Sequence, residues 1–153
     1  MPSHSDIHHS PYSPAQLYAL VLDVERYPEF LPWCRAARIT ERTAEYFIGE
    51  LIVSFSHLTE RYSSKVVGTP ATPDTPAKID VTLVQGPFAH LENHWQFVPS
   101  ESGGTEIHFA VDFKFKSAWL DRLIGGVFTR ACEKMSTAFM TRADALYKDA
   151  ARG

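Results

Sequence analysis

The last third of the chain carries the feature that most constrains the fold, a long amphipathic helical pattern. Apolar side chains recur there at the 3.6-residue spacing of one helix face, namely Leu120, Ile124, Val127, Phe128, Ala131, Met135, Ala138, Phe139 and Leu146. A continuous helix from Leu120 to Lys148 is about 43 Å long at 1.5 Å per residue. We expect Gly125 and Gly126 to kink this helix or to separate its first turn. Such a stripe must be buried against a second layer of secondary structure.

The sequence before this helix predicts that the second layer is a β-sheet. In Ile107–Lys116 every second residue is large and apolar, and the other face carries histidine, aspartate and lysine. This pattern is typical of an antiparallel strand with one wet face. Similar alternation follows Arg35 and recurs in four further segments, 47–55, 59–67, 79–83 and 91–97. We therefore predict one curved antiparallel sheet of six to seven strands, wrapped around the long C-terminal helix.

Two short helices are predicted before the first of these strands. Ser13 and Gln16 have the spacing of a capping box, and Pro14 suits the first helical position between them. Pro28 is expected to end the helix that follows, because the residue before a proline avoids helical backbone angles. The next segment, Tyr27–Cys34 (YPEFLPWC), holds four large apolar side chains and two prolines. We expect it to form a short helix or an ordered turn, and we call it the lip.

Size and charge narrow the class of protein. A chain of 153 residues fits one domain, and a formal net charge of −3 is unfavourable for holding phosphates by charge alone, so DNA is not an expected partner. Cys34 and Cys132 are its only cysteines, which favours a reducing compartment. The start, MPSHSDIHHS, has no signal-peptide pattern, and no apolar window is long enough to span a bilayer. We expect a cytoplasmic protein.

The sequence contains no clear catalytic or metal-binding motif. No serine elbow, phosphate loop or cysteine zinc pattern is present. His90, Glu92 and His94 share one strand face, but that face lies opposite the apolar one and is expected to be solvated. The histidines near the N-terminus are expected to belong to a surface tail. For an enzyme, the best inward polar candidate is Asn93, with Tyr62 or Tyr46 beside it.

The number of aromatic residues instead favours a cavity. Ten Phe, three Trp and six Tyr are more rings than one sheet and one helix need for solid packing. We expect a hydrophobic cavity between sheet and helix, with the lip at its mouth. The candidate ligand-binding residues are Tyr27, Phe30, Leu31, Trp33, Phe88, Trp95, Phe97, Phe109, Phe113, Phe115, Val127, Phe128, Met135 and Phe139. The alternative that these side chains are ordinary core stays open, above all for Phe30 and Leu31.

Five runs together resemble a known family: SPAQLYALVLDVERYPEFLPWC, LTERYSSKV, GPFAHLENHWQF, VDFKFKS and GGVFTRACEKMSTAF. In this order they are similar to the coenzyme Q-binding START-domain proteins, within the superfamily of polyketide cyclases and lipid-transfer START domains. The resemblance covers nearly the whole chain. It implies an α+β helix-grip fold of the START/Bet v 1-like type, as a single lipid-binding domain over residues 1–153 with its core at about 3–148.

The resemblance also implies a function. It implies a bacterial protein that binds ubiquinone or a related polyprenyl lipid, as a ligand and not as a catalytic cofactor. Such a protein acts as a non-catalytic chaperone or carrier in respiration, electron transport or quinone biosynthesis. Its partners would be the inner membrane, touched transiently from the periphery, and respiratory or quinone-biosynthesis proteins.

Two alternatives stay open at this stage. The same family contains ribosome-association toxins that bind the large ribosomal subunit, and Arg35, Arg38 and Arg42 offer a small basic cluster for such contact. The superfamily also contains polyketide cyclase-like enzymes, which would need an inward acid or base such as Asn93.

Overall fold

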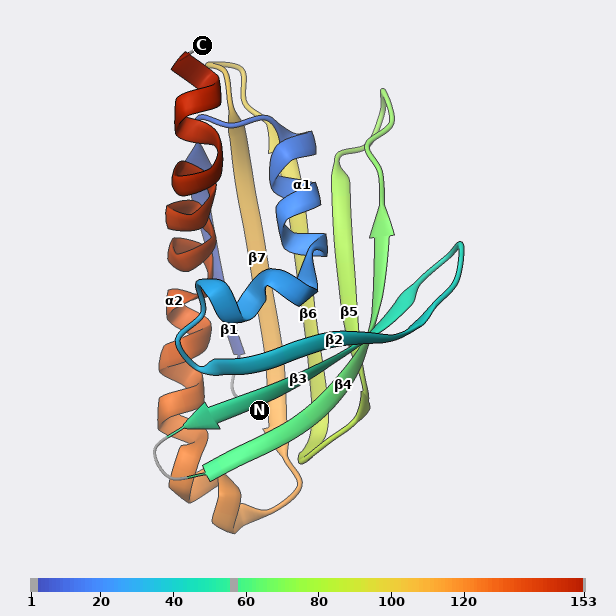
Figure 1. Ribbon diagram of the computed structural model, residues 1–153, viewed down its shortest axis with the longest axis vertical. Helices are drawn as coiled ribbons and strands as arrows, with labels where there is room; N and C mark the ends of the chain where they lie inside the picture. Colours follow the sequence, from blue (N-terminus) through green and yellow to red (C-terminus); the bar gives the residue numbers. More distant parts are fainter. Residues whose placement is uncertain (1–2, 56–57, 153) are drawn as a thin grey trace.

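A seven-stranded antiparallel sheet curves around one long helix in the computed structural model, which describes residues 3–55 and 58–152 (Figure 1). The strands are β1 (Ser3–Ser10), β2 (Cys34–Arg42), β3 (Phe47–Phe55), β4 (Leu58–Thr69), β5 (Ala77–Gln85), β6 (Phe88–Pro99) and β7 (Thr105–Phe115). Their order in the sheet is β1-β7-β6-β5-β4-β3-β2, so β1 and β2 are its edges. The predicted helix-grip α+β architecture is confirmed.

The long helix α2 (Ala118–Arg152) packs along the concave side of the sheet (Figure 1). Its 35 residues span about 52 Å. The predicted separation of the first turn at Gly125 and Gly126 is wrong, because α2 runs through both as one helix. Ile124 and Phe128 on either side of the pair are buried, and their packing offsets the roughly 1 kcal/mol cost of each helical glycine.

The strand β1 was not expected from the sequence. The segment predicted as a surface tail pairs with β7 from Ser3 opposite Asp112 to Ser10 opposite Thr105. Its inner face is polar, and the Asp6 carboxylate accepts a hydrogen bond of 2.7 Å from the Ser136 hydroxyl on α2. The strand therefore depends on backbone pairing and polar contacts with α2. Neither leaves an apolar alternation in the sequence.

The two predicted short helices are present as α1 (Pro14–Leu22) and the 3₁₀ helix η1 (Val24–Glu29). The capping box of α1 is confirmed, since Ser13 and Gln16 exchange side-chain hydrogen bonds of 3.0 and 3.2 Å with each other's backbone N–H groups. The helix ends earlier than expected, at Leu22, and Pro28 lies within η1. The lip continues from η1 through a turn into β2.

Strand register aligns one inward row across the middle of the sheet. Val66 on β4 pairs with Val81 on β5, Val81 pairs with Asn93 on β6, and Asn93 pairs with Val111 on β7. Because successive side chains alternate between faces, Ser64 and Tyr62, two and four residues before Val66, lie on the same face of β4. Within the described part of the chain, no helix is both long and apolar enough to cross a membrane.

Candidate functional site

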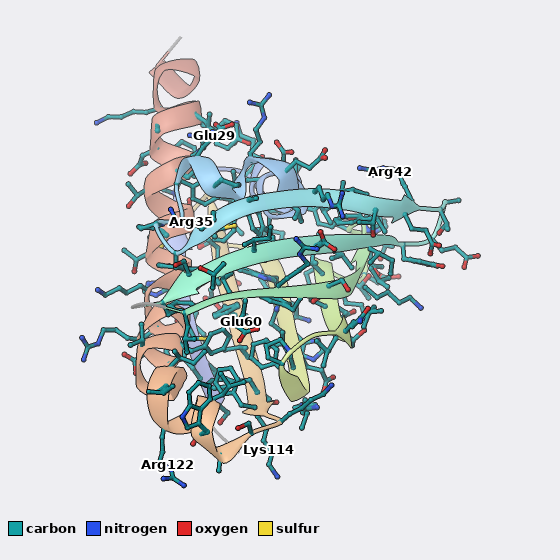
Figure 2. All side chains as sticks on the ribbon, turned by 60° about the horizontal axis from the view of Figure 1, so that its bottom comes forward. Glu29, Arg35, Arg42, Glu60, Lys114 and Arg122 are labelled. Carbon is teal, nitrogen blue, oxygen red and sulfur yellow. The ribbon has the colours of Figure 1, made fainter. Side chains whose placement is uncertain are left out.

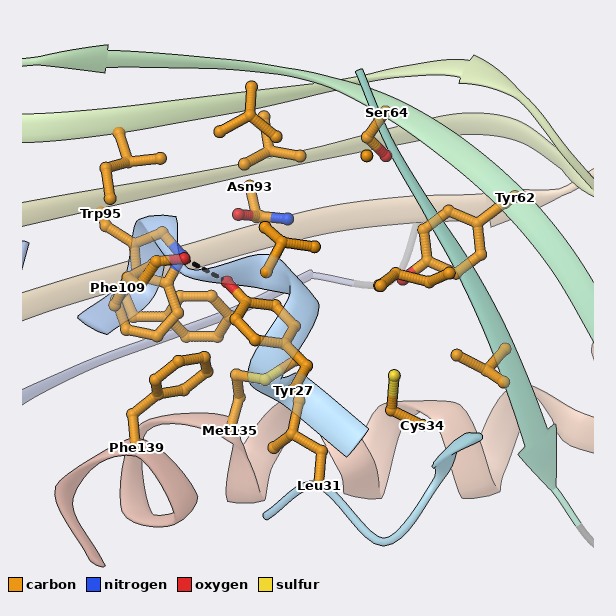
Figure 3. Close-up of a pocket in the computed structure, with 18 of the residues that line it drawn as sticks. Tyr27, Leu31, Cys34, Tyr62, Ser64, Asn93, Trp95, Phe109, Met135 and Phe139 are labelled. Atoms are coloured by element: carbon orange, nitrogen blue, oxygen red, sulfur yellow. Dashed lines mark hydrogen bonds between the residues drawn. The ribbon is translucent and has the colours of Figure 1, made fainter. Parts of the chain in front are cut away.

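An apolar cavity of about 80 Å³ lies between the middle of the sheet and α2 (Figure 3). Strands β3 to β7 form one wall, and Met135 and Phe139 on α2 form the facing wall. The lip closes one side, where Tyr27, Leu31 and Trp33 reach the cavity. Leu31 is almost fully buried, and the Trp33 carbonyl accepts a 2.9 Å hydrogen bond from the Ser54 backbone N–H, which fixes the lip to β3.

Half of the fourteen candidate residues line this cavity. They are Tyr27, Leu31, Trp33, Trp95, Phe109, Met135 and Phe139. The rings among them contact one another across the layers: Trp95 lies 4.5 Å from Phe109 and 5.1 Å from Phe139, between ring centroids. Tyr27 meets Phe139 edge-on at 5.2 Å. The lip, sheet and helix thus close around the cavity through one set of aromatic contacts.

Four further candidates lie together at another part of the interior. Phe88, Phe113, Phe115 and Phe128 pack with ring centroids 4.5 to 5.8 Å apart, and Phe55 adds a 5.8 Å contact to Phe128. We call these five residues the aromatic plug. None of them lines the 80 Å³ cavity, and Phe55 and Phe128 border a smaller void of about 40 Å³. The plug is packed core and not the cavity wall that the sequence suggested.

The last three candidates lie outside the cavity. Phe97 is fully buried against Trp95 and Tyr18. Phe30 packs on the outer side of Phe139, at 5.0 Å. The prediction that Val127 lines the cavity is wrong, because its side chain is 41% exposed. Val127 lies about 100° around the helix from the buried Phe128. The predicted buried face of the helix therefore included one residue too many.

Three polar side chains point into the cavity from the sheet: Tyr62, Ser64 and Asn93 (Figure 3). Asn93 and Tyr62 were the expected inward polar residues, and both line the cavity. Tyr46 does not, because its hydroxyl donates to Glu41 at 2.8 Å on the outside of the sheet. Ser64 was missed. Its place two residues from Val66, in the alternation of β4, was the available signal.

Ser64 is the least satisfied of these groups. The residue is 5% exposed, and its hydroxyl oxygen has no hydrogen-bond partner among the residues that the structure describes. A buried hydroxyl without a partner costs roughly 1–3 kcal/mol. The cavity therefore contains a donor and acceptor that a bound molecule could satisfy.

The cavity is electrically neutral at physiological pH. None of the described residues that line it has an acidic or basic side chain. Burial raises the pKa of the Cys34 thiol to about 11 and raises the pKa of the Tyr27 and Tyr62 phenols above their usual 10. Tyr27 also donates a hydrogen bond to the Val21 carbonyl (Figure 3). These groups stay protonated, so they offer hydrogen bonds and not a nucleophile or a base.

The histidines of β6 contact carboxylates on the outer face of the sheet, as expected. His94 lies 2.7 Å from Asp80, and His90 lies 3.3 Å from Glu92. Arg61 on the neighbouring strand β4 lies 4.0 Å from Glu50. Within residues 3–55 and 58–152 no three His, Cys, Asp or Glu side chains are grouped to hold a metal ion.

A neutral apolar cavity enclosed by a curved antiparallel sheet and a C-terminal helix defines a helix-grip domain of the START-like class. Comparison with known sequences agrees with this class. The chain belongs to the family described as "Polyketide cyclase / dehydrase and lipid transport", which matches residues 10–140.

Three known proteins illustrate what the chain is similar to. It is 45% identical to a Rickettsia prowazekii protein named ribosome association toxin RatA, over 90% of this chain and 93% of that protein. It is 32% identical to the mitochondrial coenzyme Q-binding protein COQ10 homolog B of Xenopus laevis, over 89% of this chain and 55% of that protein. The ZhuI aromatase/cyclase from Streptomyces sp. R1128 has the same fold, with a TM-score of 0.79, 15% identity and coverage of 94% and 93%.

Proposed function

We propose that this protein binds ubiquinone or a related polyprenyl lipid in its cavity and acts as a non-catalytic chaperone or carrier in respiration or quinone biosynthesis. The observation that carries the proposal is the neutral apolar cavity with its three polar side chains. The likeness to a COQ10 homolog supports it. An isoprenoid tail exposes apolar surface at roughly 25 cal/mol per Å² in water, so a carrier must cover that surface.

The cavity as it stands has room for a small ring but not for an isoprenoid tail. A volume of about 80 Å³ is far below the several hundred Å³ of usual ligand pockets. The smaller void shares Trp33, Tyr62 and Met135 with it as lining residues. Met135 is the side chain best suited to move, because unbranched methionine adapts to irregular space. Binding of a long lipid therefore requires Met135 and the lip to shift and join the two spaces.

The test is to purify the protein from cells, extract it with organic solvent and analyse the extract by mass spectrometry. Val81 lines the cavity and Val84, on the same strand, is 54% exposed. Val81→Phe should fill the cavity, while Val84→Phe adds the same ring on the outside. We expect a stoichiometric quinone or polyprenyl species with the wild type and Val84→Phe, and none with Val81→Phe. A clean wild-type extract, repeated after soaking with quinone, would contradict the proposal.

A non-catalytic role is part of this proposal. Catalysis in such a cavity would require a tuned acid or base, and the neutral lining with protonated thiol and phenol groups favours binding instead. The aromatase/cyclase neighbour shares only the fold at 15% identity. Turnover of a polyketide-like substrate that Asn93→Ala abolishes would overturn this part.

Lipid transfer also needs contact with a membrane, and we propose that α2 provides it. Phe30 and Trp33 of the lip are partly buried, whereas Trp119 in the first turn of α2 is 61% exposed. Leu123 and Val127 follow it at four-residue intervals and are also exposed, with the exposed Arg130 beside them. An exposed apolar stripe with basic neighbours suits an anionic bilayer surface at the inner membrane.

Flotation with phosphatidylglycerol vesicles tests this contact. Leu123 and Leu146 are leucines on the same helix and are 48% and 46% exposed. Only Leu123 belongs to the exposed set that also contains Trp119 and Val127. We expect Leu123→Ser to reduce flotation and Leu146→Ser to leave it unchanged. Absence of flotation by the wild type, even when loaded with lipid, would contradict membrane contact.

A second candidate function is association with the large ribosomal subunit. The 45% identity to a protein named ribosome association toxin favours it. Arg35 and Arg42 project from the edge strand β2 and are exposed, whereas Arg38 is paired with Glu50 at 2.8 Å (Figure 2). Two or three arginines against a net charge of −3 make a small basic surface for RNA.

Sedimentation with purified large subunits at modest salt separates the two functions. The double change Arg35→Glu with Arg42→Glu reverses the charge of β2. Lys114→Glu with Lys116→Glu makes the same change in net charge at the end of β7. Co-sedimentation lost in the first variant only would establish ribosome contact through β2. No co-sedimentation of the wild type would remove this candidate.

A further inference from the structure

The orphaned hydroxyl of Ser64 marks one end of the cavity as a polar subsite. Ser64 lies on the inner face of β4, with Tyr62 two residues before it and Val66 two residues after it. Its hydroxyl oxygen is buried and has no hydrogen-bond partner in the described part of the chain. In Figure 3 it points into the same space as the Asn93 amide. A buried polar group without a partner is costly, and an occupant of the cavity would relieve that cost.

Aromatic rings enclose the rest of the cavity. Tyr27 from η1 and Phe139 from α2 face the sheet, and Trp95 and Phe109 continue the sheet wall beside Asn93. A flat ring packed among these four side chains would lie beside Asn93 and Ser64 on the inner face of the sheet. The hydroxyl and the amide can both donate a hydrogen bond to an oxygen atom on such a ring.

The absence of charge in the lining decides what kind of head group fits. None of the described lining residues is acidic or basic. A carboxylate or phosphate inside this cavity would be desolvated without a counter-ion, which costs far more than burial of a neutral carbonyl. A neutral oxygenated ring loses little, because hydrogen bonds from Ser64 and Asn93 replace those that it made with water.

We propose that the cavity takes its lipid head first, with a neutral oxygenated ring whose oxygen accepts a hydrogen bond from Ser64 Oγ, and that it rejects lipids with an anionic head. This inference rests on the proposed lipid-binding function and adds the orientation and the class of head group. The apolar tail then leaves the cavity past Met135 and the lip.

Isothermal titration calorimetry with three probes tests the inference. Decylubiquinone carries a neutral oxygenated ring, decylbenzene carries a ring without oxygen, and decanoate carries an anionic head. Ser64→Ala removes the hydroxyl, Ser64→Thr keeps it, and Ser63→Ala makes the same change at the next residue, which faces the other side of β4. We expect wild type, Ser64→Thr and Ser63→Ala to bind decylubiquinone alike and Ser64→Ala to bind it about tenfold more weakly.

A second readout separates recognition from damage to the fold. Because Ser64→Ala removes a buried group that lacks a partner, its melting temperature should rise while its affinity for decylubiquinone falls. Decylbenzene should bind wild type and Ser64→Ala equally, and decanoate should bind neither.

Two other results would each contradict one part of the inference. Equal affinity of wild type and Ser64→Ala for decylubiquinone would overturn the role of Ser64. Decanoate binding as tightly as decylubiquinone would overturn the selection of a neutral head. Either result leaves the proposed lipid-binding function in place, whereas failure of all three probes to bind the wild type would contradict that function as well.

Discussion

The interior between the sheet and α2 has two regions that differ in how they are filled. At the aromatic plug, five phenylalanine rings pack at centroid distances of 4.5 to 5.8 Å. At the cavity, strands β3 to β5 contribute the smaller residues Gly49, Ser64, Val66 and Val81, and a space of about 80 Å³ remains. The same helix covers both regions. The small inward residues of β3 to β5 therefore decide where the domain is hollow.

This difference indicates that one region contributes stability and the other contributes binding. The plug joins the sheet to the first half of α2 and contributes stability. The cavity keeps an unpartnered hydroxyl and unfilled space, which both reduce stability. A protein keeps such a region when the region binds something, since stability and function commonly oppose each other at a site. The following experiments test this contrast.

The largest expected effect is at the plug. Phe128 contacts four other rings, and Phe128→Ala should lower the free energy of unfolding by about 3–5 kcal/mol. Met135→Ala at the cavity should cost only about 2 kcal/mol, because part of that side chain already faces empty space. Urea unfolding measures both values. Equal losses would mean that the two regions are packed alike.

Ligand binding in the cavity should raise the free energy of unfolding by nearly as much as Phe128→Ala lowers it. Decylubiquinone at 100 times its Kd should raise the free energy of unfolding by about 2.7 kcal/mol in the wild type. Thermal or urea unfolding with and without the probe gives this difference. Val81→Phe should abolish the gain and Val84→Phe should retain it. A gain that survives in Val81→Phe would place the bound probe elsewhere on the protein.

Alkaline pH should destabilise the folded chain through its buried thiols. Burial raises the pKa of Cys34 to about 11 from its ordinary 9. Below pH 9 the thiol is protonated in both states and contributes no pH dependence. Between pH 9 and 11 the unfolded chain releases the proton while the folded chain keeps it, so stability falls as pH rises.

Urea midpoints at pH 8, 9, 10 and 11 measure this slope. Cys34→Ala should flatten it in part, and the remainder should come from Cys132, whose pKa burial raises to about 12, and from the buried phenols. An unchanged slope in Cys34→Ala would show that this thiol is accessible to water in the folded protein.

The smallest expected effect comes from Gly49. A Cβ at this position would lie 3.5 Å from the Val24 side chain and 3.6 Å from that of Phe47, which is ordinary van der Waals contact. Gly49→Ala should therefore stabilise the protein by about 0.4–1 kcal/mol. Gly104→Ala is the opposite case, because Gly104 has φ +76° and its Cβ would lie 2.2 Å from the Ser10 carbonyl. Destabilisation by both would contradict the space assigned beside Val24.

Much of the fold was predictable because periodicity records burial. The alternation in Ile107–Lys116 and the stripe on α2 predicted a strand and a helix that the structure contains. The strand β1 was not predictable in this way. Its inner face is polar, and Asp6 is satisfied by Ser136, 130 residues away. Contacts of that kind leave no pattern along the chain.

The candidate site was predictable only in part. Tyr27, Trp33 and Asn93 were expected to face the cavity, and they do. The number of rings indicated excess aromatic volume, but it could not show that phenylalanines such as Phe113 pack against each other and leave the space elsewhere. Ser64 was not predicted, because a serine in a strand is usually solvated. Only the register of β4 places this one on the inner face.

A ¹⁵N–¹H NMR titration with decylubiquinone shows most directly whether lipid binds in the cavity. We expect amide shifts concentrated around Leu31, Gly49, Ser64 and Asn93, with little change at Phe113 and Phe115 in the plug. Shifts confined to the exposed face of α2 around Leu123, or absent at saturating probe, would contradict a lipid site in the cavity.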